Sequence, residues 1–331
     1  MKAIMINQHG GPEVLQVVDI PIPTPRHKEV LIRNHAIGVN FVDTQHRAGL
    51  NFPVNLPLIP GTEAAGVVEA VGPGVSIFAE GDRVGYAGYM GGNYAEYTVV
   101  PEEKLVPVPA NVTFELAASA LLQGMTAHCL SHSVYPIKAN DIVLIHAAAG
   151  GVGNFLVQMA KHRGATVIGT VSTPEKAEII RLLGIDHVIV YTQTDFESET
   201  MRFTGGEGVH VIYDAVGRTT FDKGIKILRA RGYMVVYGLS SGPVPLFDIN
   251  RLSGITGSGN KGSLFLTWAS LGDYAVKRED LIWRANDVLN WIGDKLLKVQ
   301  IARTLPLSDA TEAHRLVESR QVAGKVILVP L

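Results

Sequence analysis

The chain has 331 residues, more than the roughly 100–200 of one ordinary domain, so two domains are expected. Hydrophobic residues make up 47% of the chain, charged residues make up 18%, and the formal net charge is −2. These values exclude a disordered chain and a strongly basic nucleic-acid-binding protein.

The sequence contains one cysteine, Cys129. It allows neither an internal disulfide nor a zinc site built from several thiolates, so a reducing, cytoplasmic setting is expected. The first apolar run is broken at Asn7, which is too early for a signal peptide. The window most similar to a membrane span, 142–160, contains three glycines and several polar residues, and its pattern instead predicts a strand, a turn and a helix.

Short strands separated by glycine and proline turns are predicted from residue 1 to about residue 123, a pattern typical of a partly open β-barrel. The predicted strands are Lys2–Ile6, Val14–Asp19, Val30–Val39, Gly66–Val71, Arg83–Tyr86 and Tyr94–Val99. Two helical patterns follow, over Phe114–Leu122 and Met125–Val134.

From Asp141 onward, strand and helix patterns alternate, which predicts a parallel sheet with right-handed crossovers. The predicted strands are Ile142–His146, Ala165–Val171, His187–Val190, Val209–Asp214 and Tyr233–Tyr237, and the predicted helices are Val152–His162, Pro174–Leu183 and Phe221–Leu228. Beyond them we expect a helix near Glu279–Leu297, a helix capped by Ser308, and a strand Lys325–Val329 that returns to the first domain.

A glycine-rich turn follows the first strand of the alternating region. It reads Ala147-Ala-Ala-Gly-Gly-Val-Gly153 and leads into a helical pattern. Small residues at Ala148, Gly150 and Gly153 allow a tight turn, bring the backbone close to a pyrophosphate and let the helix pack on the strand. The helix N-terminus adds N–H groups and the positive end of a dipole. Although such a turn can be a plain connection, its context predicts a dinucleotide site. The expected contacts there are Gly150, Gly151 and Val152.

The end of the second strand lacks the acidic residue that marks an NAD site. Such sites place Asp or Glu on the ribose about 20 residues after the first glycine, but this stretch reads Gly169-Thr-Val-Ser-Thr-Pro-Glu-Lys176. Ser172 and Lys176 can bind a 2′-phosphate through hydrogen bonds that contribute about 1.5–3 kcal/mol each. The cofactor is therefore predicted to be NADPH. Alternatively, Ser172 and Glu175 form only a capping box, and Lys176 is a solvated surface lysine.

Two further motifs carry a family resemblance. The stretch Pro60-Gly-Thr-Glu63 leads into a strand and a Val-Gly-Pro-Gly turn, and Gly81-Asp-Arg-Val84 follows. With the Ala-Ala-Ala-Gly-Gly-Val-Gly turn, they resemble the medium-chain dehydrogenase/reductase superfamily, in particular its zinc-free quinone oxidoreductase branch, the relatives of zeta-crystallin. The resemblance covers essentially the whole chain. It implies an α/β fold with a doubly wound Rossmann cofactor domain, residues 124–266, and a GroES-like, mainly β barrel catalytic domain, residues 1–123 and 267–331.

Zinc-dependent members of that superfamily hold their catalytic metal with a Cys, a His and usually a second Cys. The matching positions in this chain are Asn40, Thr62 and Gln123, and Asn and Thr are poor zinc ligands. The region that carries four structural cysteines in alcohol dehydrogenases corresponds here to residues 86–93, which contain no cysteine. No catalytic or structural metal is therefore expected.

Without a Lewis acid, the hydride acceptor must itself be electrophilic, as a quinone or a conjugated enone is. We expect hydride transfer from C4 of NADPH in a dry cleft between the domains, with a proton from a side chain or water. The resemblance places the stretch from Asn40 to Thr44 at the nicotinamide end of the site. The catalytic candidates are Asn40, Asp43 and Gln45, and the alternative for this stretch is a turn held by local hydrogen bonds.

This chain departs from the family pattern after that stretch. Relatives commonly carry tyrosine directly after the Asp-Thr pair and again shortly afterwards, whereas this chain has Gln45-His46 and Asn51-Phe52. His46 is a candidate proton donor because its ordinary pKa lies near neutrality, and the alternative is a solvated loop histidine.

The resemblance also implies residues around the cofactor. Tyr191 and Arg320 would complete the 2′-phosphate pocket, although Arg320 can also serve at a helix end. The expected cofactor contacts are Asn40, Thr126, Gly150, Gly151, Val152, Ser172, Lys176, Tyr191, Gly238, Ser240, Phe265 and Arg320.

The expected function is that of a zinc-independent, NADPH-dependent quinone reductase. Reduction of an alkenal, an enone or an enoyl thioester is the enzymatic alternative, and a non-catalytic NADPH-binding structural or RNA-binding protein is the alternative of another class. The near-neutral charge gives RNA binding no independent support. The expected partners are a small quinone or conjugated carbonyl and, from the resemblance, a second copy of the chain paired along the edge strand 262–267, with no nucleic acid and no membrane.

Overall fold

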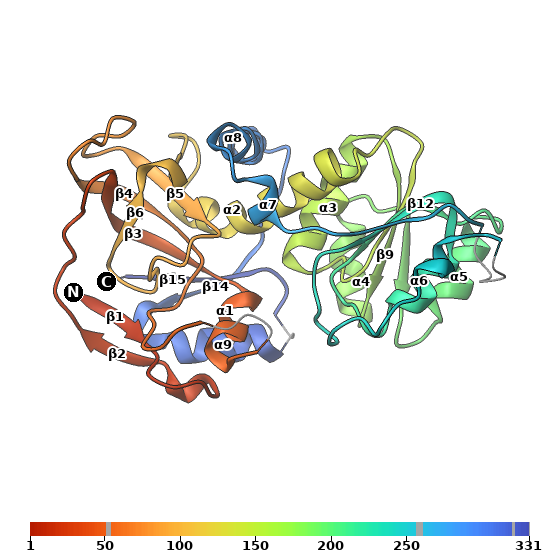
Figure 1. Ribbon diagram of the computed structural model, residues 1–331, viewed down its shortest axis with the longest axis horizontal. Helices are drawn as coiled ribbons and strands as arrows, with labels where there is room; N and C mark the ends of the chain where they lie inside the picture. Colours follow the sequence, from red (N-terminus) through yellow and green to blue (C-terminus); the bar gives the residue numbers. More distant parts are fainter. Residues whose placement is uncertain (51–53, 256–260, 320–321, 331) are drawn as a thin grey trace. The chain divides into compact units, whose positions relative to one another are not determined.

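The computed structural model describes residues 1–50, 54–255, 261–319 and 322–330. Contacts along the chain divide it into two compact units, which are described one at a time (Figure 1). The first unit contains Met1–Met125 and Tyr274–Leu331, and the second contains Thr126–Asp273.

The first unit is mainly β. Its central sheet has the strand order β14-β15-β3-β4-β5-β7, with β6 also paired to β3, and β1 pairs with β2 separately. The strands are β1 (Lys2–Met5), β2 (Gln16–Asp19), β3 (Glu29–Val39), β4 (Glu63–Val71), β5 (Arg83–Ala87), β6 (Tyr97–Pro101), β7 (Val106–Pro107), β14 (Ile301–Pro306) and β15 (Lys325–Val329). Apolar side chains of β1, β3, β4, β5 and β15 form the core of this unit together with α9.

The strand β15 returns to the first unit, as the sequence predicted. It pairs antiparallel with β3, with Val326 opposite Val39 and Leu328 opposite Ile37. On its other side it pairs parallel with β14. Residues more than 280 positions apart in sequence, such as Asn40 and Lys325, are thereby brought together at the end of β3.

The helices of the first unit differ from expectation at one important place. The stretch after Asn40, for which a turn was the alternative, forms the helix α1. It begins after Asn40, whose backbone N–H donates to the Asp43 carboxylate at 2.8 Å, and it ends at Gly49, which has a φ of 70°. The helices are α1 (Phe41–Ala48), α2 (Phe114–Cys129), whose residues after Met125 belong to the second unit, α8 (Arg278–Gly293) and α9 (Ala310–Ser319), with 3₁₀ turns at Pro12–Val14, Glu102–Lys104 and Leu307–Asp309.

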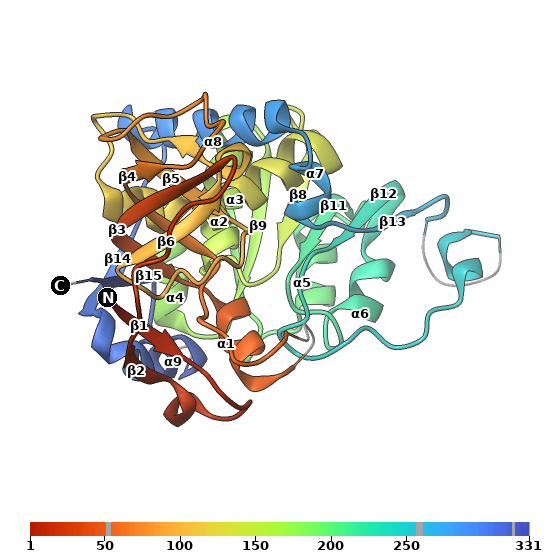
Figure 2. The ribbon, with the colours of Figure 1, turned by 60° about the vertical axis from the view of Figure 1, so that its left-hand side comes forward.

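The second unit is a doubly wound parallel sheet with the strand order β10-β9-β8-β11-β12-β13, which is the Rossmann order. Figure 2 shows the helices α5 and α6 beside this sheet. The strands are β8 (Ile142–Ile145), β9 (Thr166–Val171), β10 (His187–Val190), β11 (Val209–Asp214), β12 (Leu228–Val236) and β13 (Phe265–Trp268). The helices are α3 (Gly151–His162), α4 (Pro174–Arg181), α5 (Phe196–Phe203), α6 (Phe221–Lys226) and the short α7 (Leu271–Tyr274), with a π-helical segment at Leu130–Val134 and a 3₁₀ turn at Ile249–Leu252.

Several predicted boundaries were wrong. The two helical patterns around residues 114–134 form one helix, α2, that continues into the π-helical segment, because no residue in them breaks the backbone hydrogen bonding. Ser308 does not cap the last helix. It lies in a 3₁₀ turn, its hydroxyl donates to Asp309 at 3.3 Å, and α9 begins at Ala310.

The expected domain boundary at residue 267 falls inside a strand. Thr267 pairs with Val235 of β12, so β13 stays with the parallel sheet. Within the described residues, no helix is long and apolar enough to cross a membrane.

Candidate functional site

The turn between β8 and α3 has the geometry that a dinucleotide site requires. Gly150 caps the helix, and its N–H donates to the Ala147 carbonyl at 2.8 Å. A Cβ on Gly153 would lie 2.4 Å from the Ala147 oxygen and 2.9 Å from the Ala148 Cα. Only glycine therefore lets α3 approach the strand this closely, and a helix N-terminus of this kind can bind phosphates through its N–H groups.

Ser172, Lys176 and Tyr191 follow two adjacent strands, β9 and β10. The Lys176 Nζ donates to the Ser172 Oγ at 3.3 Å, and the Tyr191 backbone N–H donates to the Val171 carbonyl at 3.0 Å. The capping box that was the alternative for Ser172 is not formed, because Thr173 is the N-cap of α4 and accepts from the Lys176 backbone N–H. The Ser172 hydroxyl does not cap α4 and instead accepts from the Lys176 ammonium, which favours an anion site over the capping alternative.

Gly238 and Ser240 lie beyond the carboxyl end of β12. A Cβ on Gly238 would lie 2.8 Å from the Ala215 oxygen, and the Ser240 backbone N–H donates to the same oxygen at 3.1 Å. Phe265, in contrast, is the first residue of β13 and pairs with Tyr233, at the amino end of this parallel edge. Its ring is half exposed and stacks on that tyrosine, so this position does not match the predicted cofactor contact, which requires the carboxyl end of the sheet.

Asn40, Thr126 and Arg320 are the other cofactor candidates, and Asn40 is described with the polar cluster below. Thr126 is half-buried in α2. Arg320 lies outside the described residues, as do Asn51 and Phe52.

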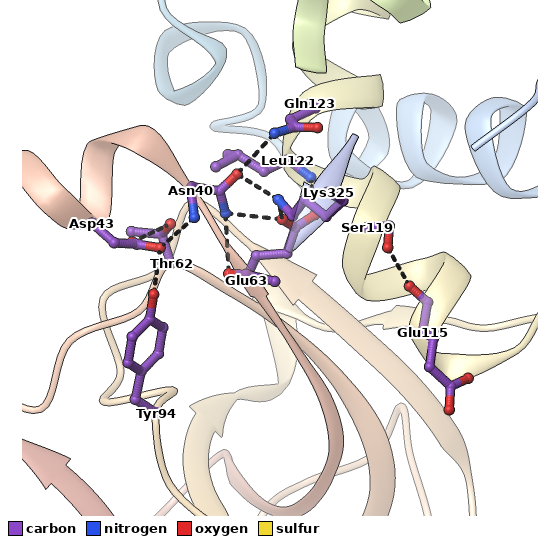
Figure 3. A network of polar contacts seen from close by, with 11 residues as sticks. Asn40, Asp43, Thr62, Glu63, Tyr94, Glu115, Ser119, Leu122, Gln123 and Lys325 are labelled. Carbon is purple, nitrogen blue, oxygen red and sulfur yellow. Dashed lines mark hydrogen bonds and ion pairs between the residues drawn. The ribbon is translucent and has the colours of Figure 1, made fainter. Parts of the chain in front are cut away.

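A buried polar cluster surrounds Asn40 at the end of β3 (Figure 3). The Lys325 ammonium donates to the Asn40 Oδ1 and to the Glu63 Oε2, both at 2.6 Å. The Asn40 Nδ2 donates to the same carboxylate at 2.9 Å, and the Glu63 Oε1 accepts from the Leu122 backbone N–H at 2.6 Å. The side chains of Lys325 and Glu63 are 2% and 0% exposed, so this ion pair is fully desolvated and depends on these additional hydrogen bonds.

Gly38 makes room for this cluster. A Cβ there would lie 2.1 Å from the Ala118 oxygen and 2.6 Å from the Glu63 Oε2. The cluster engages both ends of the Asn40 side-chain amide, which therefore has a firm orientation.

Asp43 lies beside this cluster and is also buried. Its carboxylate accepts hydrogen bonds from the Asn40 backbone N–H at 2.8 Å, the Thr62 hydroxyl at 2.8 Å and the Tyr94 hydroxyl at 3.3 Å (Figure 3). Burial raises the pKa of Asp43 to about 6, while the hydrogen bonds from Asn40 and Thr62 and the Lys325 charge act in the opposite direction. The carboxyl is therefore mostly ionised at neutral pH, and its protonation begins close to the physiological range.

Gln45 and His46, the two residues after the Asp-Thr pair, both lie on α1. Gln45 is half-buried. His46 is 6% exposed, so the alternative of a solvated loop histidine was wrong, and burial lowers the pKa of the imidazole. A neutral imidazole is a poor proton donor, which weakens the catalytic assignment of His46.

The three positions that match zinc ligands in relatives are occupied by a hydrogen-bonded set. The Gln123 Nε2 donates to the Asn40 Oδ1 at 3.4 Å, and Thr62 binds Asp43 as described above. Among the residues that the structure describes, no three or more His, Cys, Asp or Glu side chains form a group that could hold a metal ion.

Sequence reasoning missed three members of this site: Glu63, Lys325 and Tyr94. Glu63 was part of the Pro-Gly-Thr-Glu motif but was given no role, and Lys325 is simply the first residue of a predicted strand. A lysine in the first position of an otherwise apolar strand was the only signal in the sequence, and it does not reveal the partner.

Comparison with known proteins agrees with this architecture. Residues 26–110 match the family described as alcohol dehydrogenase GroES-like domain, and residues 151–276 match the one described as zinc-binding dehydrogenase. Quinone oxidoreductase 1 of Escherichia coli (strain K12) is 41% identical over 99% of both chains. A 2-haloacrylate reductase of a Burkholderia species is 40% identical over 100% of this chain and 99% of its own. The crystal structure of an Escherichia coli quinone oxidoreductase complexed with NADPH superposes with a TM-score of 0.94, at 41% identity and 100% coverage of both chains.

A GroES-like unit joined to a Rossmann-ordered parallel sheet defines the medium-chain dehydrogenase/reductase fold. Within that superfamily, the chain belongs to the quinone oxidoreductase branch, since the identity to those enzymes extends over its full length.

Proposed function

We propose that this protein is an NADPH-dependent quinone reductase that transfers hydride to its acceptor without a zinc ion. The observation that carries the proposal is the contact between Lys176 and Ser172 beside Tyr191, at the ends of adjacent strands. A cation and two hydroxyl groups at this edge suit a 2′-phosphate, and no carboxylate ends β9.

The described residues fit the cofactor in two places. The close approach of α3 at Gly153 leaves space and N–H groups for the pyrophosphate at Gly150, Gly151 and Val152. Ser172, Lys176 and Tyr191 would hold the adenosine 2′-phosphate, with Gly238, Ser240 and Thr126 as further proposed contacts. Phe265 is left out of this set because of its position at the amino end of β13.

NADPH supplies a hydride, which is two electrons and one proton. The acceptor takes the hydride together with one proton from water or a side chain, so a quinone becomes a hydroquinone and NADP⁺ is released. The protein has to bind both molecules and exclude water, and it has to keep the polar groups near the acceptor in place. We assign this last task to Asn40, Asp43 and Thr62, and we retain Gln45 as a candidate contact.

The charges of the polar cluster favour a neutral acceptor. Lys325 of the cluster and Arg47 of α1 are buried cations that already have carboxylate partners, Glu63 and Glu318 respectively. A substrate carboxylate bound next to them would compete for these cations at a high desolvation cost. A quinone needs no such counter-charge.

A conjugated carbonyl is the second candidate acceptor. It is favoured by the 40% identity to a 2-haloacrylate reductase, whose named substrate contains an activated double bond. The chemistry is the same, with hydride added to the β-carbon and a proton to the α-carbon.

The test follows NADPH and NADH consumption by chelator-treated protein with a simple benzoquinone and, in parallel, with a conjugated enal and with 2-chloroacrylate. We expect rapid, NADPH-selective turnover of the quinone that is insensitive to the chelator. Selective turnover of the enal or the chloroacrylate would replace the quinone by the second candidate. Absence of turnover with every acceptor would contradict a reductase of this kind.

We also propose a homodimer formed along β13. This strand ends the sheet in the described part of the chain, and Phe265, Leu266 and Trp268 on it are all more than a third exposed. Such an edge invites pairing with a second copy. Trp268→Glu should shift the mass in analytical ultracentrifugation from dimer to monomer, whereas Leu182→Glu, at an exposed position after α4, should not. A wild-type monomer would contradict the proposal.

A further inference from the structure

A continuous chain of polar contacts lies behind Asp43, within the first unit. The Tyr94 hydroxyl contacts the Asp43 Oδ2 at 3.3 Å and the His314 Nε2 at 3.1 Å. The other ring nitrogen, Nδ1, is 3.3 Å from the Arg47 Nη1. Arg47 in turn donates to the Glu318 carboxylate and, through Nε, to the Gly10 carbonyl at 3.0 Å. Tyr94 thus links Asp43 of α1 to His314 of α9, and Arg47 of α1 contacts His314 and Glu318 of α9 directly.

The chemistry of these groups fixes the direction of each hydrogen bond. A guanidinium has only donors, so Arg47 must donate and the His314 Nδ1 must accept. A neutral imidazole then carries its single proton on Nε2, which donates to the Tyr94 oxygen. The tyrosine proton is consequently directed at Asp43, which accepts as a carboxylate.

Burial keeps this arrangement in one state. Asp43, Tyr94 and His314 are fully buried, and Arg47 is 2% exposed. Protonated His314 would direct an N–H at the Arg47 N–H groups, and burial together with the Arg47 charge lowers the pKa of His314 to about 3. The ring therefore stays neutral throughout the range in which an enzyme works.

The charged and titratable groups around Asp43 come from four elements. Tyr94 faces it from the loop after β5, Glu63 from β4, Lys325 from β15, and Arg47 follows it on α1. Only Tyr94 among these donates directly to the carboxylate. His314 and Arg47 therefore influence the Asp43 carboxylate through the Tyr94 hydroxyl.

We propose that Tyr94, His314 and Arg47 are positioning residues that hold Asp43 as an anion in one orientation, so that Asn40 and Thr62 keep their places in the active site. This inference rests on the proposed reductase function and on the role given there to Asn40, Asp43 and Thr62. Three donors converge on the carboxylate, and protonation of Asp43 would turn one of these acceptor positions into a donor. Catalysis that needs the intact arrangement is therefore lost as Asp43 is protonated.

The same directions argue against a proton-conducting path. His314 can pass its Nε2 proton onward only if Nδ1 gains another, and the group facing Nδ1 is a guanidinium that stays protonated. The chain fixes an orientation and does not deliver protons from the surface.

The first experiment measures kcat/KM for benzoquinone against pH in Tyr94→Phe. Loss of a donor to the carboxylate raises the Asp43 pKa, so the acid limb should move upward by about one pH unit, while the KM for NADPH stays unchanged. Tyr86→Phe is the matched control, because this buried tyrosine lies in the same unit and donates to Asn34, which is not part of the series of contacts from Asp43 to Arg47. His314→Leu should shift the acid limb upward as Tyr94→Phe does. His314→Gln keeps one acceptor and one donor, so its acid limb should stay close to that of the wild-type protein. An acid limb that stays in place in Tyr94→Phe, or that moves equally in the control, would overturn the proposal.

The second experiment does not depend on activity. Nitrogen-15 NMR of histidine-labelled wild-type protein, with His314→Gln used for assignment, should show His314 as the neutral tautomer protonated on Nε2 from pH 5 to pH 8. A proton on Nδ1, or an imidazolium at pH 7, would overturn the inferred directions. If the wild-type protein reduced no quinone but showed this tautomer, the proposed function would fail while the inferred chain would stand.

Discussion

The cofactor turn in the second unit and the polar cluster in the first unit are built in opposite ways. The turn consists of consecutive residues, Ala147 to Gly153, and its key property is the absence of a Cβ where α3 approaches β8, at Gly153. The cluster joins Asn40, Glu63 and Lys325, and Glu63 and Lys325 are 262 positions apart in sequence. Its key property is the pairing of buried charges. Local sequence therefore specifies the first site, whereas only the completed fold specifies the second.

Breaking the buried ion pair should have the largest effect. Lys325→Met leaves the Glu63 charge buried without its partner and should lower the free energy of unfolding by about 3–5 kcal/mol. Urea denaturation measures this effect, and the exposed pair between Lys2 and Asp19 provides the control, since Lys2→Met should cost about 0–1 kcal/mol. Glu63→Gln combined with Lys325→Met should be less destabilised than Lys325→Met alone. Equal losses in Lys325→Met and Lys2→Met would show that the cluster is not a desolvated pair.

The turn should fail for a steric reason. Gly153→Ala places a Cβ 2.4 Å from the Ala147 oxygen, which should force α3 away from β8, destabilise the protein by about 1–3 kcal/mol and weaken NADPH binding. Gly272→Ala is the matched control, because the nearest atom to its Cβ is the Ser270 Oγ at 3.6 Å. Calorimetric titration with NADPH measures the binding, and unchanged affinity in Gly153→Ala would separate this glycine from the cofactor site.

The sequence predicted the fold and the cofactor turn because both depend on local patterns. Strand and helix alternation led to the parallel sheet, and the glycine spacing led to the helix N-terminus beside it. The polar cluster was only half visible. Asn40 and Asp43 were identified through a resemblance, but the helix α1 was not predicted. Its buried side chains are polar, so its sequence lacks the regular apolar spacing that predicts a helix, and their partners Tyr94 and His314 come from other elements. Contacts between such distant residues leave no local signal.

The predicted 2′-phosphate contacts in the second unit should determine the preference for NADPH over NADH. Lys176→Ala should reduce the preference for NADPH over NADH by about 10- to 100-fold, because one charge-assisted hydrogen bond is lost. The ratio of kcat/KM for the two cofactors measures the preference. Lys223→Ala, which removes an exposed lysine paired with Asp195, should leave the ratio as it is. A ratio that Lys176→Ala does not change would return Lys176 to the role of a surface lysine.

The smallest catalytic effect is expected at His46. Its imidazole is buried and its pKa is lowered by burial, so it is neutral at pH 7 and above, and His46→Ala should leave kcat within about twofold of wild type from pH 7 to pH 8, although the protein loses some stability. Steady-state turnover of benzoquinone over that range measures this, with a melting curve for the stability. A large loss of kcat at unchanged folded fraction would instead make His46 the missing proton donor.

The position of β15 within the sheet also has a consequence for synthesis on the ribosome. The second unit, Thr126–Asp273, is translated completely after Glu63 and before Lys325. It can therefore fold while the first unit still lacks β14 and β15, with Glu63 waiting for its counter-ion. A nascent chain stalled before residue 325 would contain a folded second unit and an incomplete first unit. The incomplete first unit is the part of this protein that we expect a chaperone to bind during synthesis.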